Sequence, residues 1–142
     1  MKIKKQLTAL IAASTLVGTL PASAHEGQHM TPEMMLSLAR VGASSLSPDG
    51  KTIVYSVGFP NIKENKIRTE LFSIASNGTG RRQLTQGIAG LHGARWIQQG
   101  RRISYISSES GEPQVWTMAP DGTDRKQVTR IEGGLSDHLF SP

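Results

Sequence analysis

The sequence predicts an all-β fold: a partial β-propeller of about two blades, each with four antiparallel strands, plus the start of a third. Three observations favour this fold, namely short strand-like apolar segments, turn residues between them, and a pattern that recurs with a period in the forties. A signal peptide and a short helix come before the repeats. We expect a signal peptide at 1–24, a flexible mature N-terminus at 25–30 and an incomplete propeller domain at 31–142.

The N-terminal segment has the three parts of a secretory signal peptide. Met1–Lys5 is positively charged, Leu7–Leu20 is apolar, and Ala22-Ser23-Ala24 is a small-residue cleavage site. The apolar run is shorter than the roughly 20 residues that a membrane-spanning helix needs. An uncleaved anchor is the alternative, but the cleavage site favours removal. We therefore expect His25 to be the first residue of the mature chain, which would have no stable membrane anchor.

The segment His25-Glu-Gly-Gln-His29 matches the H-E-x-x-H pattern of zinc proteases. That chemistry requires both histidines one turn apart on a helix, with the glutamate placed to activate a zinc-bound water. Gly27 disfavours a helix here, and no third ligand stands at a recognisable position. We therefore interpret the motif as part of a solvated tail and assign it no metal.

The segment Thr31–Ala39 predicts a short helix. Thr31 is a suitable N-cap, Pro32 fits the first turn, and Glu33 lies near the positive end of the helix dipole. Gly42 is expected to end this helix.

Five pairs of like residues recur at two fixed spacings in the mature chain. The pairs 44 residues apart are Phe72 and Trp116, Gly78 and Gly122, and Thr85 and Thr129; those 50 apart are Gly50 and Gly100, and Tyr55 and Tyr105. A longer loop between Tyr55 and Phe72 accounts for the difference. These spacings indicate one blade at about 43–87 and another at about 93–131. Phe140 lies 44 residues after Trp96, so 135–142 would begin a third blade.

Turn residues separate the strand-like segments. Pro48-Asp49-Gly50 suits a chain reversal, and both Asn77-Gly78 and Asp121-Gly122 are typical of hairpins. In the second unit Gln98-Gln99-Gly100 replaces Pro-Asp-Gly and keeps the glycine. A β-sandwich with chance turn spacing is the alternative fold.

The aromatic residues are expected to belong to the core. Trp96 and Trp116 occupy repeat positions, which favours packing between blades over a ligand-stacking site. With only two blades present, Tyr55, Phe72, Tyr105 and Trp116 are each expected to be half covered.

Composition narrows the possible partners. The chain has 16 basic and 11 acidic residues, and loss of Lys2, Lys4 and Lys5 with the signal peptide leaves 13 basic residues and a net charge of +2. We therefore expect no nucleic-acid partner. The absence of cysteine excludes a disulfide, a thiol nucleophile and a cysteine-ligated zinc site. No cofactor is expected.

The entry into the repeats resembles a known family. Thr31-Pro-Glu, Leu38-Ala-Arg-Val-Gly42 and Leu46-Ser-Pro-Asp-Gly-Lys51 are similar to the opening of secreted bacterial peptidases of the prolyl oligopeptidase family. The closest likeness is to the dipeptidyl-peptidase and acylaminoacyl-peptidase branch, and it covers residues 31–142. Glu64-Asn65-Lys66 before the strand Glu70–Ile74 also resembles the family's first blade. The resemblance implies a propeller that caps a C-terminal α/β-hydrolase domain.

The catalytic motif of that family is absent from this sequence. Its serine lies in G-x-S-x-G, on a strained strand-to-helix turn, whereas Gly42-Ala-Ser44 and Gly134-Leu-Ser136 lack the closing glycine. Ser136-Asp137-His138 contains the triad residue types, but neighbours in sequence do not reach the triad geometry. No catalytic, cofactor-binding or metal-binding residue is therefore assigned, and the chain alone is expected to be inactive.

These observations predict the N-terminal propeller segment of a secreted serine exopeptidase. In the intact enzyme the propeller would gate the access of peptide substrates to the hydrolase domain. The sequence stops at Phe140-Ser-Pro142, before an Asp-Gly turn, so we expect a piece of a longer protein. One alternative is a TolB-like periplasmic module that binds proteins, and another is a non-functional remnant of a disrupted reading frame. The peptidase and TolB-like hypotheses both place the chain in the periplasm or outside the cell.

Export gives the first testable prediction. If Ala22-Ser23-Ala24 is cleaved, mass spectrometry of the exported chain will show His25 as its first residue. Replacing Ala24 with a bulky residue should block processing, because the cleavage site requires small side chains. Finding Met1 intact in the mature pool of the parent chain would contradict the assignment.

Overall fold

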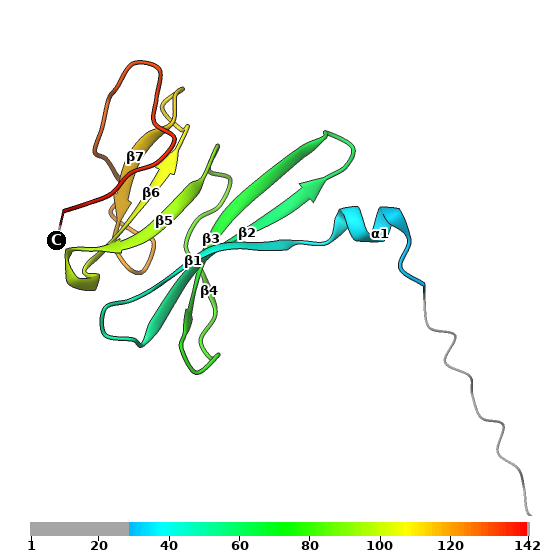
Figure 1. The fold of residues 1–142 in the computed structure, drawn as a ribbon, viewed down its shortest axis with the longest axis horizontal. Coiled ribbons are helices and arrows are strands. Elements are labelled where there is room, and N and C mark those ends of the chain that lie inside the picture. Colours follow the sequence, from blue (N-terminus) through cyan, green and yellow to red (C-terminus); the bar gives the residue numbers. More distant parts are fainter. Residues whose placement is uncertain (1–28, 142) are drawn as a thin grey trace, which may run out of the picture.

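A computed structural model describes residues 29–141 of the chain. The expected signal peptide and its cleavage residues Ala22, Ala24 and His25 lie outside the described residues. Two four-stranded antiparallel sheets follow one short helix (Figure 1). Their strand orders are β1-β2-β3-β4 and β5-β6-β7-β8, each in sequence order. The two predicted units of four antiparallel strands are therefore confirmed.

The strands follow the predicted repeat closely. The first sheet contains β1 (Arg40–Leu46), β2 (Thr52–Asn61), β3 (Lys66–Ala75) and β4 (Arg82–Gln83). The second contains β5 (His92–Ile97), β6 (Arg102–Ser107), β7 (Gln114–Met118) and β8 (Lys126–Gln127), with the 3₁₀ turn η1 (Gln98–Gly100) between β5 and β6. Within the described residues no strand is assigned after Gln127, so a third blade beginning at 135 stays a prediction.

The predicted helix forms as α1 (Pro32–Ser37). The side chain of Thr31 caps it, because the Met34 N–H donates to the Thr31 hydroxyl oxygen at 3.2 Å. The helix ends before Ala39, since Leu38 already has extended backbone angles, with φ −66° and ψ 131°.

The expectation that Gly42 ends the helix is wrong. Gly42 lies inside β1, which is paired with β2 from Arg40 onward and changes register between Val41 and Ser44. A Cβ at position 42 would come within 2.6 Å of the Ser56 hydroxyl oxygen on β2. The glycine therefore permits a close approach of two strands, and the helix ends earlier through the backbone at Leu38.

The two hairpin turns predicted between the third and fourth strands have the same hydrogen bonds. In the first sheet Asn77 Oδ1 accepts from the Thr79 N–H at 3.1 Å, and in the second Asp121 Oδ1 accepts from the Thr123 N–H at 3.0 Å. Gly78 and Gly122 follow with φ of 84° and 88°, which only glycine adopts readily. Three consecutive positive-φ residues build the Gln98-Gln99-Gly100 turn, so that turn survives without Pro-Asp.

The hydrophobic core lies between the two sheets. Val54 and Leu71 of the first sheet and Ile103, Tyr105 and Met118 of the second are completely buried members of one cluster. Figure 1 shows β5 beside β1, where the strands of the two sheets meet.

Both tryptophans lie where the repeat placed them. Trp96 and Trp116 are partly buried and pack against the core between the sheets, as predicted. The indole N–H of Trp96 on β5 also donates to the carbonyl oxygen of Ser45 on β1 at 3.1 Å, which ties the second sheet to the first.

The expectation of four half-covered aromatic side chains is wrong for two of them. Tyr105 is 0% exposed because the first sheet covers it, and Phe72 is 5% exposed. Phe72 lies on the face of the first sheet that points away from the second, but Arg81 covers it with its guanidinium carbon 4.5 Å from the ring centre. Tyr55 stacks beside it at 5.8 Å between ring centres. A cation and a second ring therefore shield an aromatic group that no third sheet covers in the described chain.

The segment after the second sheet contacts β6 at positions that correspond to two core residues of the preceding sheets. Val54 and Ala94 belong to the same core cluster. Ser104 lies 50 residues after Val54, and His138 lies 44 after Ala94, as the repeat spacing requires. His138 Nε2 lies 2.8 Å from the Ser104 hydroxyl oxygen, so a hydrogen-bonded polar pair replaces an apolar one. This correspondence supports the prediction that a third unit starts here.

His138 gives a pH prediction. Burial, and then the positive charge of Arg95, lowers the pKa of His138 from its ordinary value of 6.5, against a weaker opposing effect of Asp137. The unfolded chain therefore binds this proton more readily than the folded chain, and the free energy of unfolding falls as pH drops below about 6.5. Chemical denaturation between pH 7 and pH 5 should show this loss. The loss should shrink in His138→Ala and persist in the exposed control His29→Ala; equal losses in both variants would contradict the assignment.

Candidate functional site

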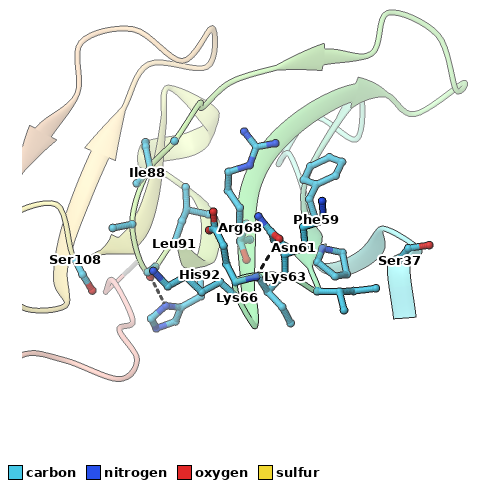
Figure 2. Close-up of a pocket in the computed structure, with 18 of the residues that line it drawn as sticks. Ser37, Phe59, Asn61, Lys63, Lys66, Arg68, Ile88, Leu91, His92 and Ser108 are labelled. Atoms are coloured by element: carbon cyan, nitrogen blue, oxygen red, sulfur yellow. Dashed lines mark hydrogen bonds between the residues drawn. The ribbon is translucent and has the colours of Figure 1, made fainter. Parts of the chain in front are cut away.

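A groove of about 1090 Å³ opens between the β2–β3 hairpin and the segment 87–92 that connects the two sheets (Figure 2). The hairpin forms one wall from Phe59 to Thr69. The connecting segment forms the other wall, with Ile88, Leu91 and His92 among its lining residues. Ser108 and Pro113, in the loop between β6 and β7, also line the groove.

The hairpin wall exists because the first repeat is longer than the second. β2 and β3 have 10 residues each, whereas their counterparts β6 and β7 have 6 and 5. The register runs without a break to the pair Asn61 and Lys66, beyond which a tight turn reverses the chain. Asn61 Oδ1 accepts from the Glu64 N–H at 3.2 Å, and Asn65 takes a φ of 49°, which asparagine tolerates better than most residues.

A buried carboxylate fixes the start of the connecting wall. Glu70 is 0% exposed; its Oε2 accepts from the Thr85 hydroxyl at 2.8 Å and its Oε1 from the Gly87 N–H at 2.7 Å. Thr85 in turn accepts from the Leu71 N–H at 2.8 Å. Arg68 partly compensates the charge, with Nη1 3.5 Å from Glu70 Oε1. Glu70 therefore joins the base of the hairpin to the first residues of the opposite wall.

The second sheet holds the other part of the same wall. The Ala89 carbonyl oxygen accepts from the Ser108 N–H at 2.8 Å and from the Ser107 hydroxyl at 3.2 Å. The ring of His92 lies against the carbonyl oxygens of Gly90 and Ser136, at 2.8 and 3.3 Å. Because both sheets hold the segment, the width of the groove depends on how the sheets pack.

Positive charge predominates in the groove. Lys63, Lys66 and Arg68 line it, and Glu64 is the acidic side chain among its lining residues. Arg68 also lies over the ring of Phe59, 5.5 Å from the ring centre. Within residues 29–141 neither lysine forms an ion pair. The arrangement offers two uncompensated ammonium groups beside an apolar surface.

The triad-like motif does not assemble into a catalytic site. The ring of His138 contacts Ser104, a pairing that sequence reasoning missed, while Asp137 accepts from the His138 backbone N–H at 2.8 Å and pairs with Arg95 at 3.3 Å. Ser104 is 0% exposed, so no substrate reaches its hydroxyl. Among the described residues His138 Nδ1 has no hydrogen-bond partner, so a third triad member is missing as well. The 44-residue spacing to Ala94 was the signal that could have located His138 against the second sheet.

Residues 29–141 contain no group of three or more histidine, cysteine or acidic side chains placed to hold a metal ion. None of their helices is long and apolar enough to span a membrane.

Comparison with known proteins identifies the relatives of this chain. No family model matches the sequence. The chain is 42% identical over 149 residues to dipeptidyl-peptidase 5 of Porphyromonas endodontalis, covering 98% of this chain and 22% of that protein. It is also 42% identical over 143 residues to dipeptidyl-peptidase 5 of Porphyromonas gingivalis, covering 99% of this chain and 21% of that protein. The chain is homologous to a segment of dipeptidyl-peptidase 5. It spans about a fifth of the length of these curated relatives.

Solved structures agree on the fold. The AtxE2 isopeptidase matches with a TM-score of 0.62 and 19% identity over 77% of this chain and 22% of that one. The acylaminoacyl peptidase of Pyrococcus horikoshii matches with a TM-score of 0.55 and 14% identity, over 69% of this chain and 15% of that one. TolB of Acinetobacter baumannii matches with a TM-score of 0.51 and 21% identity, over 63% of this chain and 21% of that one. The predicted partial propeller and the predicted resemblance to dipeptidyl and acylaminoacyl peptidases are therefore confirmed.

The second sheet has a residue at the position that corresponds to Glu70. Gln114 lies 44 residues after Glu70, and its Oε1 accepts from the Thr129 hydroxyl at 2.8 Å and from the Ile131 N–H at 3.1 Å. An uncharged amide thus makes the corresponding bonds there.

Glu70→Ala should lower the free energy of unfolding by about 1–3 kcal/mol, because it leaves a buried hydroxyl and a backbone N–H without an acceptor. Glu70→Gln should lower it less, and the exposed control Glu64→Ala should change it little. Urea denaturation measures all three variants. An equal loss in the Gln and Ala variants of Glu70 would show that the charge, and not these two hydrogen bonds, holds the wall.

Proposed function

We propose that this chain is the propeller segment of a secreted dipeptidyl-peptidase whose α/β-hydrolase domain lies outside residues 1–142. The observation that carries the proposal is the 42% identity to two dipeptidyl-peptidases along nearly the whole chain, which accounts for about a fifth of their length. Within residues 29–141 the serine of the one serine–histidine side-chain hydrogen bond, Ser104, is 0% exposed, so a substrate does not reach its hydroxyl. The chemistry is therefore assigned to the hydrolase domain.

In this proposal the hydrolase domain and the propeller have different functions. The hydrolase domain would supply an activated serine that attacks the peptide carbonyl and forms an acyl-enzyme, which water then hydrolyses. The propeller would supply selection, because a ring of blades in front of the active site admits extended peptides and excludes folded proteins. The groove at the β2–β3 hairpin is open to an extended chain. These features support a gating role for the segment, with peptides as substrates and the hydrolase domain as its partner.

The same proposal places the enzyme in the periplasm or outside the cell. The predicted signal peptide at 1–24 and the sequence relationship to dipeptidyl-peptidase 5 support that location.

A TolB-like module that binds other proteins is the second candidate, because TolB of Acinetobacter baumannii has a comparable fold. The two candidates differ in what must accompany the blades. A peptidase needs a hydrolase domain with a G-x-S-x-G turn, whereas a binding module needs blades alone.

Extension of the reading frame beyond residue 142 tests the proposal. The extended protein should contain G-x-S-x-G and release dipeptides from the N-terminus of peptide substrates, and replacing the serine of that motif with alanine should abolish the release. The chain of residues 25–142 serves as the control and should release nothing. Further blades without the motif would favour the binding module, and an immediate stop codon would favour a remnant.

A further inference from the structure

We propose that the groove binds an extended peptide segment with acidic side chains at alternate positions, by adding it as a strand to the free edge of β3. This inference deepens the proposed function and rests on it for the role of the bound peptide as substrate. The edge and the charges that carry the inference belong to this chain and are independent of the hydrolase domain.

The first argument is an unpaired strand edge. β3 pairs with β2 along its whole length, from Lys66 to Ala75, but it pairs with β4 only at Phe72 and Ser73. The N-terminal part of β3, Lys66–Thr69, therefore has no strand on its other side within the described residues. These residues all line the groove. Backbone groups along such an edge form a ready template for an incoming extended peptide.

The second argument is the charge pattern along that edge. Lys66 and Arg68 are two residues apart on one strand, so their side chains lie on the same face. Figure 2 shows both side chains between the two walls of the groove. An added strand places its own alternate side chains next to them, because cross-strand neighbours share a face. Carboxylates at every second position of the peptide would therefore meet the Lys66 ammonium and the Arg68 guanidinium.

The third argument is that the site has spare positive charge beside apolar surface. Arg68 is partly engaged with Glu70, but Lys66 and Lys63 form no ion pair among the described residues. Phe59, Ile62 and Ile67 provide apolar surface in the groove, and the last two are 54% and 60% exposed. Such a lining accommodates the aliphatic parts of a peptide. A neutral peptide would use the strand edge alone, whereas an acidic one would use the edge and the ammonium groups.

Fluorescence anisotropy on the mature chain tests the proposal with three labelled peptides of equal length. One carries glutamates at alternate positions, one carries the same number of adjacent glutamates, and one has glutamines at the alternate positions. We expect the alternating glutamate peptide to bind about three- to tenfold more tightly than its glutamine twin, with the adjacent-glutamate peptide between them. The advantage should decrease as salt is raised, because exposed charges are screened.

Charge reversal at matched positions locates the site. Lys66→Glu should remove the preference for the alternating glutamate peptide, while Lys51→Glu, which makes the same charge change in the exposed turn at the opposite end of β2, should keep it. Thermal melting of both variants checks that they fold like the parent chain. Hydrogen exchange gives a second measurement. The N–H and C=O groups of Leu71 point away from β2, so those of Ile67 and Thr69 do as well. Bound peptide should therefore slow exchange at Ile67 and Thr69 and leave the turn around Lys51 unchanged.

Several results would overturn the proposal. Equal binding of the three peptides, equal losses in the two lysine variants, or no protection of Ile67 and Thr69 would each do so. Binding of phosphatidylglycerol vesicles that depends on Lys66, without binding of the peptides, would instead identify an anionic membrane surface as the ligand. Because the assay needs no catalysis, its failure is distinct from the failure of the extended protein to release dipeptides.

Discussion

The stacking of the second sheet on the first is the interaction on which the rest of the structure depends. Neither sheet has a core of its own, because the buried side chains of Val54 and Leu71 are covered only when Ile103 and Tyr105 lie against them. The Trp96 indole, bonded to the Ser45 carbonyl oxygen, sets where β5 lies on β1. The same stacking brings the Ala89 carbonyl to the second sheet and so positions the connecting segment as a groove wall.

A pair of hydrogen bonds recurs in both sheets, formed by a carboxylate in the first sheet and by an uncharged amide in the second. Glu70 and Gln114 hold the chain after the fourth strand of their sheets through a threonine hydroxyl and a backbone N–H. The amide satisfies these donors at no electrostatic cost, whereas the buried carboxylate requires compensation. Arg68 supplies part of it at 3.5 Å. The charged version therefore occurs in the repeat whose lengthened hairpin can bring an arginine to the carboxylate.

Sequence reasoning located the repeat accurately because blade turns depend on local chemistry. Asn77 and Asp121 each bond their own turn, and the following glycines take positive φ, so residue type alone indicated these hairpins. The end of the helix was missed because Gly42 serves a contact with Ser56 on another strand, and a glycine in a sequence does not show whether it ends a helix or admits a neighbour. The groove was not predicted either, because it too depends on contacts between distant parts of the chain. Its walls come from segments about 20 residues apart, and it arises only when the sheets stack.

The two repeats differ in the length of the β2–β3 hairpin, and this hairpin also carries the basic side chains of the groove. Positions that match between repeats build the common core, and their side chains are largely buried there. The extra residues of the first repeat form a hairpin end whose side chains are exposed, positively charged and next to an unpaired edge. Stacking does not require this extension, because β6 and β7 form their sheet without it. A feature that the architecture can omit, and that carries uncompensated charge, is better explained by a ligand than by folding.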